Sequence, residues 1–165
     1  MPPMARGLAG MDSRSLREAF SLFATGVTIV TAQDAGGAKV AITANSFTSV
    51  SMDPPLILWC LANESRHIPA FDVGRRFAIH VLNERQAEVA RLCARSGAPP
   101  VEVRSVPSLP PVIDHALARI TCRVTECRSA GDHVIIIGLV EEVEKIEGAP
   151  LVFHASCFGA FMPAL

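Results

Sequence analysis

The chain has 165 residues, of which 50% are apolar and 19% are charged, and its fifteen basic and sixteen acidic residues give a formal net charge of −1. This balance lacks the positive charge of a nucleic-acid-binding protein, and the low charge also excludes a disordered chain. We expect residues 1–10 to form a flexible tail and residues 11–165 to form a single domain. A chain with so many apolar residues either covers one of its faces in an oligomer or binds an apolar ligand. We expect a homodimer.

Five scattered cysteines form no C-x-x-C pair and no metal-ligand spacing with histidine. They are typical of small buried side chains in a reducing compartment, and we predict no metal site. The first ten residues lack the apolar core of a signal peptide, and no stretch offers the roughly 20 apolar residues of a membrane span. We therefore expect a cytoplasmic protein that does not enter a membrane.

The first half of the chain predicts one helix followed by strands. Apolar residues spaced by three and four positions predict a helix over residues 11–23, after which β-branched residues dominate. The next predicted strands, joined by a glycine-containing hairpin turn, are residues 26–33 and 39–44. A polar run at 45–51 is predicted to be a loop. Residues 56–62 are apolar at every position, which predicts a central strand buried on both faces.

The second half predicts further strands around one helix and a long loop. A short helix near residues 68–72 and a strand at 77–82 precede a helix over 83–95, which Gly97 ends. Five prolines make residues 97–111 a loop. The remaining predicted strands are residues 116–127, 134–146 and 151–154. Six or seven strands without an alternating strand–helix rhythm indicate a closed or partly closed antiparallel barrel.

Two polar segments are the candidates for binding chemistry. Six of the nine residues at 43–51 are Ser, Thr or Asn, which fits either an ordinary loop or a cradle for a polar ring or a phosphate. In the segment 63–67, Ser65 and Arg66 could bind a phosphate, or Ser65 could simply cap a helix. The chain has no dinucleotide-binding G-x-G-x-x-G, Walker, G-x-S-x-G or H-E-x-x-H motif.

Four segments, in this order along the chain, resemble the flavin reductase family with the FMN-binding split barrel. They are F-A-T-G-V-T-I-V-T from Phe23, T-A-N-S-F-T-S-V-S-M-D-P-P-L from Thr43, F-A-I-H-V-L from Phe77 and G-D-H-V-I-I-I-G from Gly131. The second segment is the most specific. Members of this family are the small components of two-component flavin monooxygenases.

The resemblance implies a mainly β fold, a six-stranded antiparallel Greek-key split barrel with a few peripheral helices. It also implies a homodimer with flavin near the subunit interface. NADH or NADPH would reduce FMN or FAD, and the reduced flavin would pass to a partner monooxygenase or be released. The cofactors would carry the hydride chemistry, and the protein would supply stacking and orientation.

The resemblance also assigns residues. Side chains of the polar run would line the flavin ring and its ribityl chain, namely Thr43, Asn45, Ser46, Thr48, Ser49 and Ser51. The backbone of Cys60 and Ala62 would approach the flavin, and the phosphate would be bound by Ser65, Arg66 and His67. His133, the one candidate catalytic residue, would help to seat the nicotinamide. Phe158 would stack on the flavin, although taken alone it is typical of a core residue.

The sequence departs from the family pattern at three places. His80 stands where the family usually has an asparagine, and Phe158 stands where it usually has a tyrosine. The proline-rich segment 98–111 replaces an Asp-basic-Phe motif that helps to cover the flavin. Two alternatives therefore stay open: an FMN-binding split-barrel protein with another oxidase activity, and a non-catalytic, flavin-free dimeric module.

Overall fold

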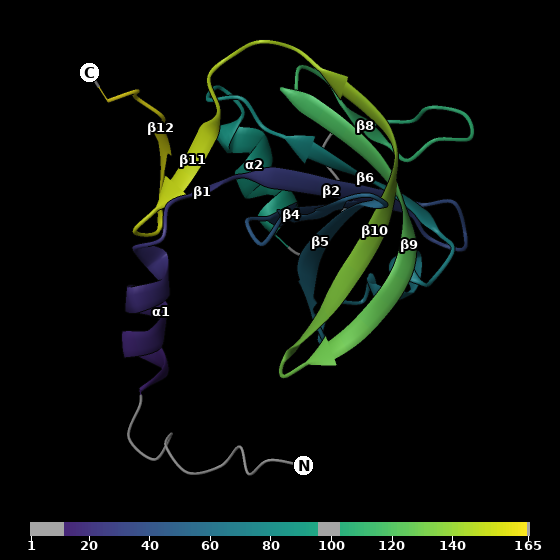
Figure 1. Cartoon of the computed structure of the whole chain (residues 1–165), viewed down its shortest axis with the longest axis horizontal. Helices are drawn as coiled ribbons and strands as arrows, with labels where there is room; N and C mark the ends of the chain where they lie inside the picture. The colour runs from purple at the N-terminus through teal and green to yellow at the C-terminus, as the bar shows by residue number, and fades with distance from the viewer. Residues whose placement is uncertain (1–11, 96–102, 165) are drawn as a thin grey trace.

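The structure, a computed structural model, describes residues 12–95 and 103–164 (Figure 1). The helical elements are α1 (Ser13–Ser21), η1 (Ile68–Phe71) and α2 (Ala87–Ala94). The strands of the first half are β1 (Thr25–Gly26), β2 (Thr28–Gln33), β3 (Lys39–Ala44), β4 (Thr48–Met52), β5 (Pro55–Ala62) and β6 (Arg76–Val81). Those of the second half are β7 (Val103–Arg104), β8 (Val112–Ile113), β9 (Ala118–Ala130), β10 (His133–Lys145), β11 (Leu151–His154) and β12 (Cys157–Ala160).

The main sheet has seven antiparallel strands in the order β3-β2-β6-β9-β10-β5-β4. In Figure 1 the long strands β9 and β10 curve around the molecule, and the sheet coils without closing on itself. The predicted mainly β, antiparallel split barrel is therefore confirmed, with seven strands in this sheet instead of six. A second small sheet joins β1, β11 and β12, and β7 pairs with β8.

An aromatic cluster fills the inside of the coiled sheet. The rings of Trp59 and Phe71 meet edge to face with centroids 4.9 Å apart, and Phe77 packs beside both. All three side chains are essentially inaccessible to solvent. A glycine leaves room for this packing, because a Cβ atom at position 138 would lie 2.6 Å from Phe77 Cζ.

A second core lies on the outer face of β2 and β6, under α2 and the β7–β8 ladder. Its buried members include Ile29, Leu82, Ala90, Val103 and Ile113. Two polar contacts fix the covering segment, because Thr31 Oγ1 donates to Pro111 O at 2.5 Å and Lys39 Nζ donates to Val103 O at 2.7 Å. The described part of the proline-rich segment therefore covers this outer face, whereas residues 97–102 lie outside the described residues.

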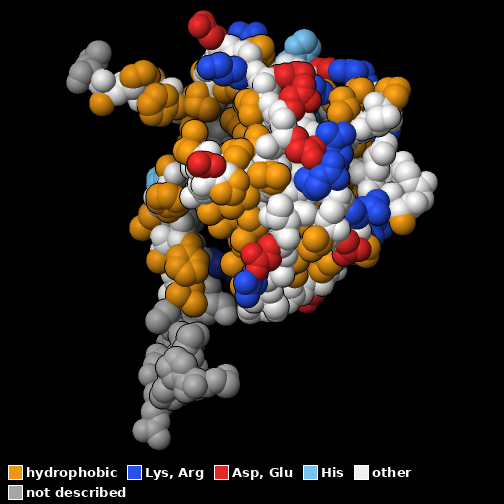
Figure 2. Space-filling view, turned by 45° about the vertical axis from the view of Figure 1, so that its right-hand side comes forward, with side chains coloured by type: hydrophobic (Ala, Val, Ile, Leu, Met, Phe, Trp, Pro, Cys, Tyr) orange, Lys and Arg blue, Asp and Glu red, His pale blue; other side chains and the backbone are white. Residues whose placement is uncertain are grey.

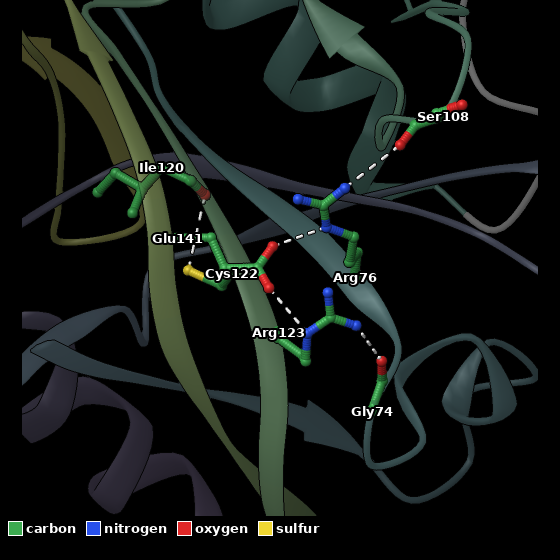
Figure 3. A network of polar contacts seen from close by, with 7 residues as sticks. All are labelled: Gly74, Arg76, Ser108, Ile120, Cys122, Arg123 and Glu141. Carbon is green, nitrogen blue, oxygen red and sulfur yellow. Dashed lines mark hydrogen bonds and ion pairs between the residues drawn. The ribbon is translucent and has the colours of Figure 1, made fainter. Parts of the chain in front are cut away.

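A carboxylate on β10 joins three strands of the main sheet (Figure 3). Glu141 lies at a β-bulge, between the paired residues Val140 and Glu142, and it accepts hydrogen bonds from Arg76 Nε and Arg123 Nε, each at 2.7 Å. A β-bulge changes the direction in which a side chain points, and here the side chain is that of Glu141. Burial raises the pKa of the Glu141 carboxyl, but the two arginine hydrogen bonds outweigh it and hold that pKa below its ordinary value.

Several element boundaries differ from the sequence prediction. Helix α1 begins at Ser13 because Asp12 accepts a hydrogen bond from Arg14 N, and the predicted start at Met11 lies outside the described residues. Residues 83–86 are a turn instead of the first turn of α2, with Gln86 Oε1 accepting from Asn83 N at 3.0 Å. Strand β12 was not predicted. It follows β11 through a tight turn at Ala155 and Ser156, both with positive φ.

Two predictions for β4 and β5 are wrong. The polar run was expected to be a loop, but residues 48–52 pair with β5 as an edge strand, in which the β-branched Thr48 and Val50 favour extended backbone. Strand β5 lies between β10 and β4, as expected of a central strand, but it is buried on only one face, where Ile57, Trp59 and Leu61 point into the core. Its other face is half-exposed in the single chain.

Helix α1 stands beside the barrel and buries none of its residues (Figure 1). Its end is held to the β11–β12 turn by a hydrogen bond from Ala155 N to Ser21 O at 2.8 Å. Phe20 and Phe23 are 72% and 78% exposed. Figure 2 shows apolar side chains gathered on the side of the molecule that carries this helix and the C-terminal segment. Within the described residues, every helix is too short or too polar to span a membrane.

Candidate functional site

A cleft of about 520 Å³ lies where the ends of β3 and β5 meet the end of α2 and the start of β10. This volume falls within the roughly 300–1,000 Å³ of ordinary ligand-binding pockets. Its walls combine apolar strand residues with hydroxyl, amide, imidazole and guanidinium groups. The lining residues are Ala41, Ile42, Thr43, Ala44, Asn45, Ser46, Cys60, Leu61, Ala62, Glu64, Ser65, Arg66, His67, Cys93, Ala94, Arg95 and His133.

The cleft brings together both polar segments that the sequence singled out. Nine of the predicted site residues line it: Thr43, Asn45, Ser46, Cys60, Ala62, Ser65, Arg66, His67 and His133. They come from four separate parts of the chain. The sequence pattern alone could not show that these parts meet, because their convergence depends on how β3 and β5 are placed by the coiled sheet.

One serine joins the first polar segment, residues 43–51, to strand β5, which leads into the second. Ser46 Oγ accepts a hydrogen bond from the backbone N–H of Cys60 at 2.9 Å, and it lies 3.4 Å from Cys60 O. The segment that follows β3 is thereby fixed against the last part of β5. The Cys60 N–H is consequently engaged within the chain, so the predicted backbone approach of Cys60 to a ligand is limited by this bond.

A threonine attaches α2 to the floor of the cleft. Thr43 Oγ1 donates to the carbonyl of Ala90 at 2.6 Å, which fixes α2 along β3. The last residues of α2, among them Cys93, then reach the cleft wall. The Thr43 hydroxyl therefore donates its proton to the helix, and only its lone pairs are left to accept from a ligand.

The turn after β5 is fixed by its own polar groups. Ser65 N donates to Ala62 O at 3.0 Å, and Ser65 Oγ accepts from His67 N at 3.3 Å. Arg66 Nε donates to His67 Nε2 at 3.4 Å. Burial, and then the neighbouring Arg66 charge, lower the pKa of His67. His67 is therefore neutral at pH 7, and Arg66 carries the permanent positive charge of this turn.

His133 is positioned at the cleft by strand register. It pairs across the sheet with Ala62, and the adjoining turns are tied by Asn63 N donating to Asp132 O at 2.9 Å. The Asp132 carboxylate lies 2.7 Å from His133 Nδ1. This hydrogen bond lowers the pKa of Asp132. A carboxylate accepts only, so the proton of this bond belongs to Nδ1, and the Nε2 of the neutral ring is an acceptor.

Four predicted residues do not line the cleft. Thr48, Ser49 and Ser51 lie on β4, at the edge of the main sheet. Phe158 packs against Phe153, with ring centroids 5.5 Å apart, and joins the second core, as expected for a core aromatic. Their contact with a flavin stays a prediction, because it would require the ligand to extend beyond this cleft.

Eight lining residues were not predicted from the sequence, and three of them carry a charged or thiol side chain: Glu64, Cys93 and Arg95. Glu64 lies inside the candidate segment 63–67, so its proximity was already visible in the sequence. Cys93 and Arg95 belong to the end of α2, and only the packing of that helix on β3 brings them to the site. A charged residue at a helix end carries no sequence signal of such a role.

The sequence matches a family described as "Flavin reductase like domain" over residues 20–161. A "Probable flavin reductase" of Rhizobium meliloti is 47% identical over 141 residues, which are 81% of this chain and 44% of that protein. The "FMN reductase (NADH) SmoA" of Agrobacterium fabrum is 42% identical over 160 residues, covering 92% of this chain and 88% of the relative. The chain thus spans less than half of the first relative and most of the second.

Further relatives and a solved structure extend this similarity. Three relatives at 32–41% identity are named as reductase subunits or components, two of them of flavin-dependent monooxygenases. The crystal structure of BorF, the flavin reductase component of a bacterial two-component tryptophan halogenase, superposes with a TM-score of 0.82 at 39% identity. The match covers 93% of this chain and 100% of that one.

Proposed function

The chain belongs to the flavin reductase family, and on this premise we propose that its cleft binds FMN or FAD for reduction by NADH or NADPH. The observation that carries the proposal is the convergence of two polar strand ends, joined by the Ser46–Cys60 hydrogen bond, around one cleft. A role in flavin reduction is also what the names of the relatives describe.

The residues of the cleft fit a flavin. Strand residues such as Ala41 and Ile42 supply an apolar surface, and the side chains of Asn45 and Ser46 supply polar groups. A flavin ring combines an apolar benzenoid edge with a polar pyrimidine edge, and it needs both kinds of wall. When bound, the flavin accepts a hydride from the nicotinamide, so the protein needs to orient two rings and exclude water.

We place the phosphate of the flavin at the turn after β5. Arg66 supplies a permanent positive charge there, and a guanidinium matches a phosphate with paired donors. The Ser65 hydroxyl accepts from His67 N, so its own proton is available to a phosphate oxygen. Neutral His67 completes the turn without adding charge.

His133 is our candidate for positioning the nicotinamide. Its hydrogen bond to Asp132 fixes the ring and leaves Nε2 as an acceptor. A carboxamide N–H₂ group is a donor that suits this acceptor. His133 would thus hold the nicotinamide, and its role would be orientation instead of acid–base catalysis.

The homodimer remains our proposal for the exposed apolar surface. The outer face of β5, together with exposed Val50 and Met52 on β4, is open in the single chain. Such a face is typical of a protein interface. Because the cleft opens at the end of β5, a second copy placed on this face would lie close to the bound flavin.

We further propose that a flavin-dependent oxygenase consumes the reduced flavin. The names of several relatives, which are reductase subunits of flavin-dependent monooxygenases, support this proposal. Transfer of reduced flavin between two proteins requires that the cleft release it. The open cleft, formed on the surface between strand ends, is compatible with such release.

The direct test is NADH and NADPH oxidation, followed by the loss of nicotinamide absorbance with and without added FMN or FAD. We expect oxidation that depends on the added flavin. Tight FMN binding without oxidation of either nucleotide would favour another oxidase activity on the same barrel. A preparation that binds neither flavin would favour a non-catalytic dimeric module.

A further inference from the structure

A second arginine in the cleft is used by none of the contacts described so far. We propose that Arg95 binds the phosphate of the flavin together with Arg66, which makes it a specificity-determining residue for phosphorylated flavins over riboflavin. This inference rests on the proposed function and adds one residue to it. It follows from three observations: the charge balance of the cleft, the placement of α2 and the exposed guanidinium of Arg95.

The charge balance of the cleft favours a second cation beside a bound phosphate. A phosphate monoester carries roughly −1.5 to −2 charges at pH 7. Arg66 compensates one of these, but Glu64 also lines the cleft and its carboxylate opposes an anion. His67 is neutral, because burial and Arg66 lower its pKa. Among the described residues that line the cleft, Arg95 is the remaining permanent positive charge.

The placement of α2 brings Arg95 to the site. The bond from Thr43 Oγ1 to Ala90 O fixes the helix along β3, and Arg95 is its C-cap, with its N–H donating to Leu92 O at 3.3 Å. The C-terminal end of a helix carries a partial negative charge, which disfavours an anion nearby. A guanidinium at this end offsets that charge, and an anion in the cleft then meets a positive wall.

The guanidinium of Arg95 is available for a ligand. Arg91, one turn earlier on α2, forms an ion pair with Glu88 at 3.3 Å, whereas the Arg95 side chain has no hydrogen-bond or ion-pair partner among residues 12–95 and 103–164. Its side chain is exposed, so binding a phosphate costs it little desolvation. An arginine that lines the cleft, is exposed and has no partner within the described residues is suited to bind an anion there.

The phosphate could belong to the flavin or to the nicotinamide dinucleotide, and the experiment separates the two. Arg95→Gln is compared with the unchanged protein for binding of riboflavin and of FMN, by quenching of flavin fluorescence without any nicotinamide. We expect FMN affinity to fall by roughly tenfold, the lower end for a charge-assisted contact at an exposed site, and riboflavin affinity to stay within twofold. Arg95→Lys, which keeps the positive charge, should lose less FMN affinity than Arg95→Gln.

Arg85→Gln is the matched control, because Arg85 is exposed, precedes the same helix and does not line the cleft. It makes the same change in net charge and should leave both affinities unchanged. Equal losses of FMN affinity in both variants would show a general charge effect and overturn the inference. So would an Arg95→Gln protein that binds FMN normally but has a raised KM for NADPH alone, since Arg95 would then bind the nicotinamide nucleotide.

Flavin binding in the cleft and phosphate binding by Arg95 can be tested separately. If the unchanged protein binds neither riboflavin nor FMN, both the proposed function and the role of Arg95 are wrong. If it binds FMN more tightly than riboflavin and Arg95→Gln leaves that preference intact, only the role of Arg95 is overturned. A double Arg66→Gln, Arg95→Gln variant whose loss is not the product of the two single losses would support one shared phosphate.

Discussion

Ser46 Oγ accepts a hydrogen bond from the backbone N–H of Cys60 at 2.9 Å across fourteen residues of sequence. This contact joins the end of β3 to β5, and both residues line the candidate flavin site. A single hydroxyl therefore fixes the first polar segment to the strand that leads into the second, and the proposed function depends on both segments. Its loss should affect both the stability of the chain and the shape of the cleft.

The first prediction concerns this hydroxyl. Ser46→Ala leaves the half-buried Cys60 N–H without its partner, which typically costs about 1–2 kcal/mol. We expect the free energy of unfolding in urea to fall by that amount, and FMN binding to weaken as well. Ser129→Ala, at an exposed position on β9, is the control and should change neither quantity. Equal stability of the two variants would show that the Ser46 bond does not fix the strands.

The second prediction concerns the phosphate-binding turn. Arg66→Ala removes the permanent charge of the turn after β5, and we expect FMN affinity to fall by about tenfold or more. Riboflavin, which lacks the phosphate, should bind the variant and the unchanged protein equally. Titration of both flavins by fluorescence quenching measures this difference. Unchanged FMN affinity would place the phosphate elsewhere in the cleft.

The agreement between sequence and structure is closest where local signals are strong. Strand β3 has the predicted bounds, 39–44, because a turn with two glycines and a polar run delimit it. Strand β4 was missed, because its Ser and Thr residues are equally typical of a loop and its pairing with β5 is decided by the sheet. The cleft itself depends on contacts such as Thr43–Ala90 that join distant segments. These contacts are the reason that Arg95 could not be assigned from the sequence.

The third prediction concerns a buried histidine. His80 is fully inaccessible to solvent and lies 3.2 Å from Ile29 O through Nδ1, and burial lowers its pKa from 6.5 to about 4. Because the folded state resists protonation, the unfolded state binds the extra proton as the pH falls below 6.5. Stability from this residue is therefore full above pH 6.5 and is lost progressively down to about pH 4. The loss amounts to about 3 kcal/mol at about 1.4 kcal/mol per pH unit.

Urea unfolding at pH 7 and pH 5 tests the His80 prediction. Between pH 7 and pH 5 the free energy of unfolding of the unchanged protein should fall by about 2 kcal/mol more than that of His80→Asn, because pH 5 lies about 1.5 units below the ordinary histidine pKa. His154→Gln, at an exposed position, should lose as much as the unchanged protein. The comparison uses the change with pH within each variant, so a general destabilisation by the substitution does not affect it. Parallel losses in all three proteins would contradict the prediction.

The fourth prediction concerns the packing of the barrel interior. A methyl group at position 138 would approach Phe77 Cζ to 2.6 Å, and Phe77 is completely buried between two other aromatic rings. Gly138→Ala should therefore lower the free energy of unfolding by about 1–3 kcal/mol. Gly159→Ala is the control, since no atom lies within 4 Å of its added Cβ. A Gly138→Ala protein as stable as the control would show that the aromatic cluster can shift.

The central claim is that one cleft, between the strand end at Ser46 and the turn at Arg66, binds the flavin. A crystal structure of the protein grown with FMN tests it most directly. We expect the ring beside Asn45 and Ser46 and the phosphate within hydrogen-bond distance of Arg66. An FMN bound at another surface, or a cleft that stays empty at a saturating FMN concentration, would contradict the account.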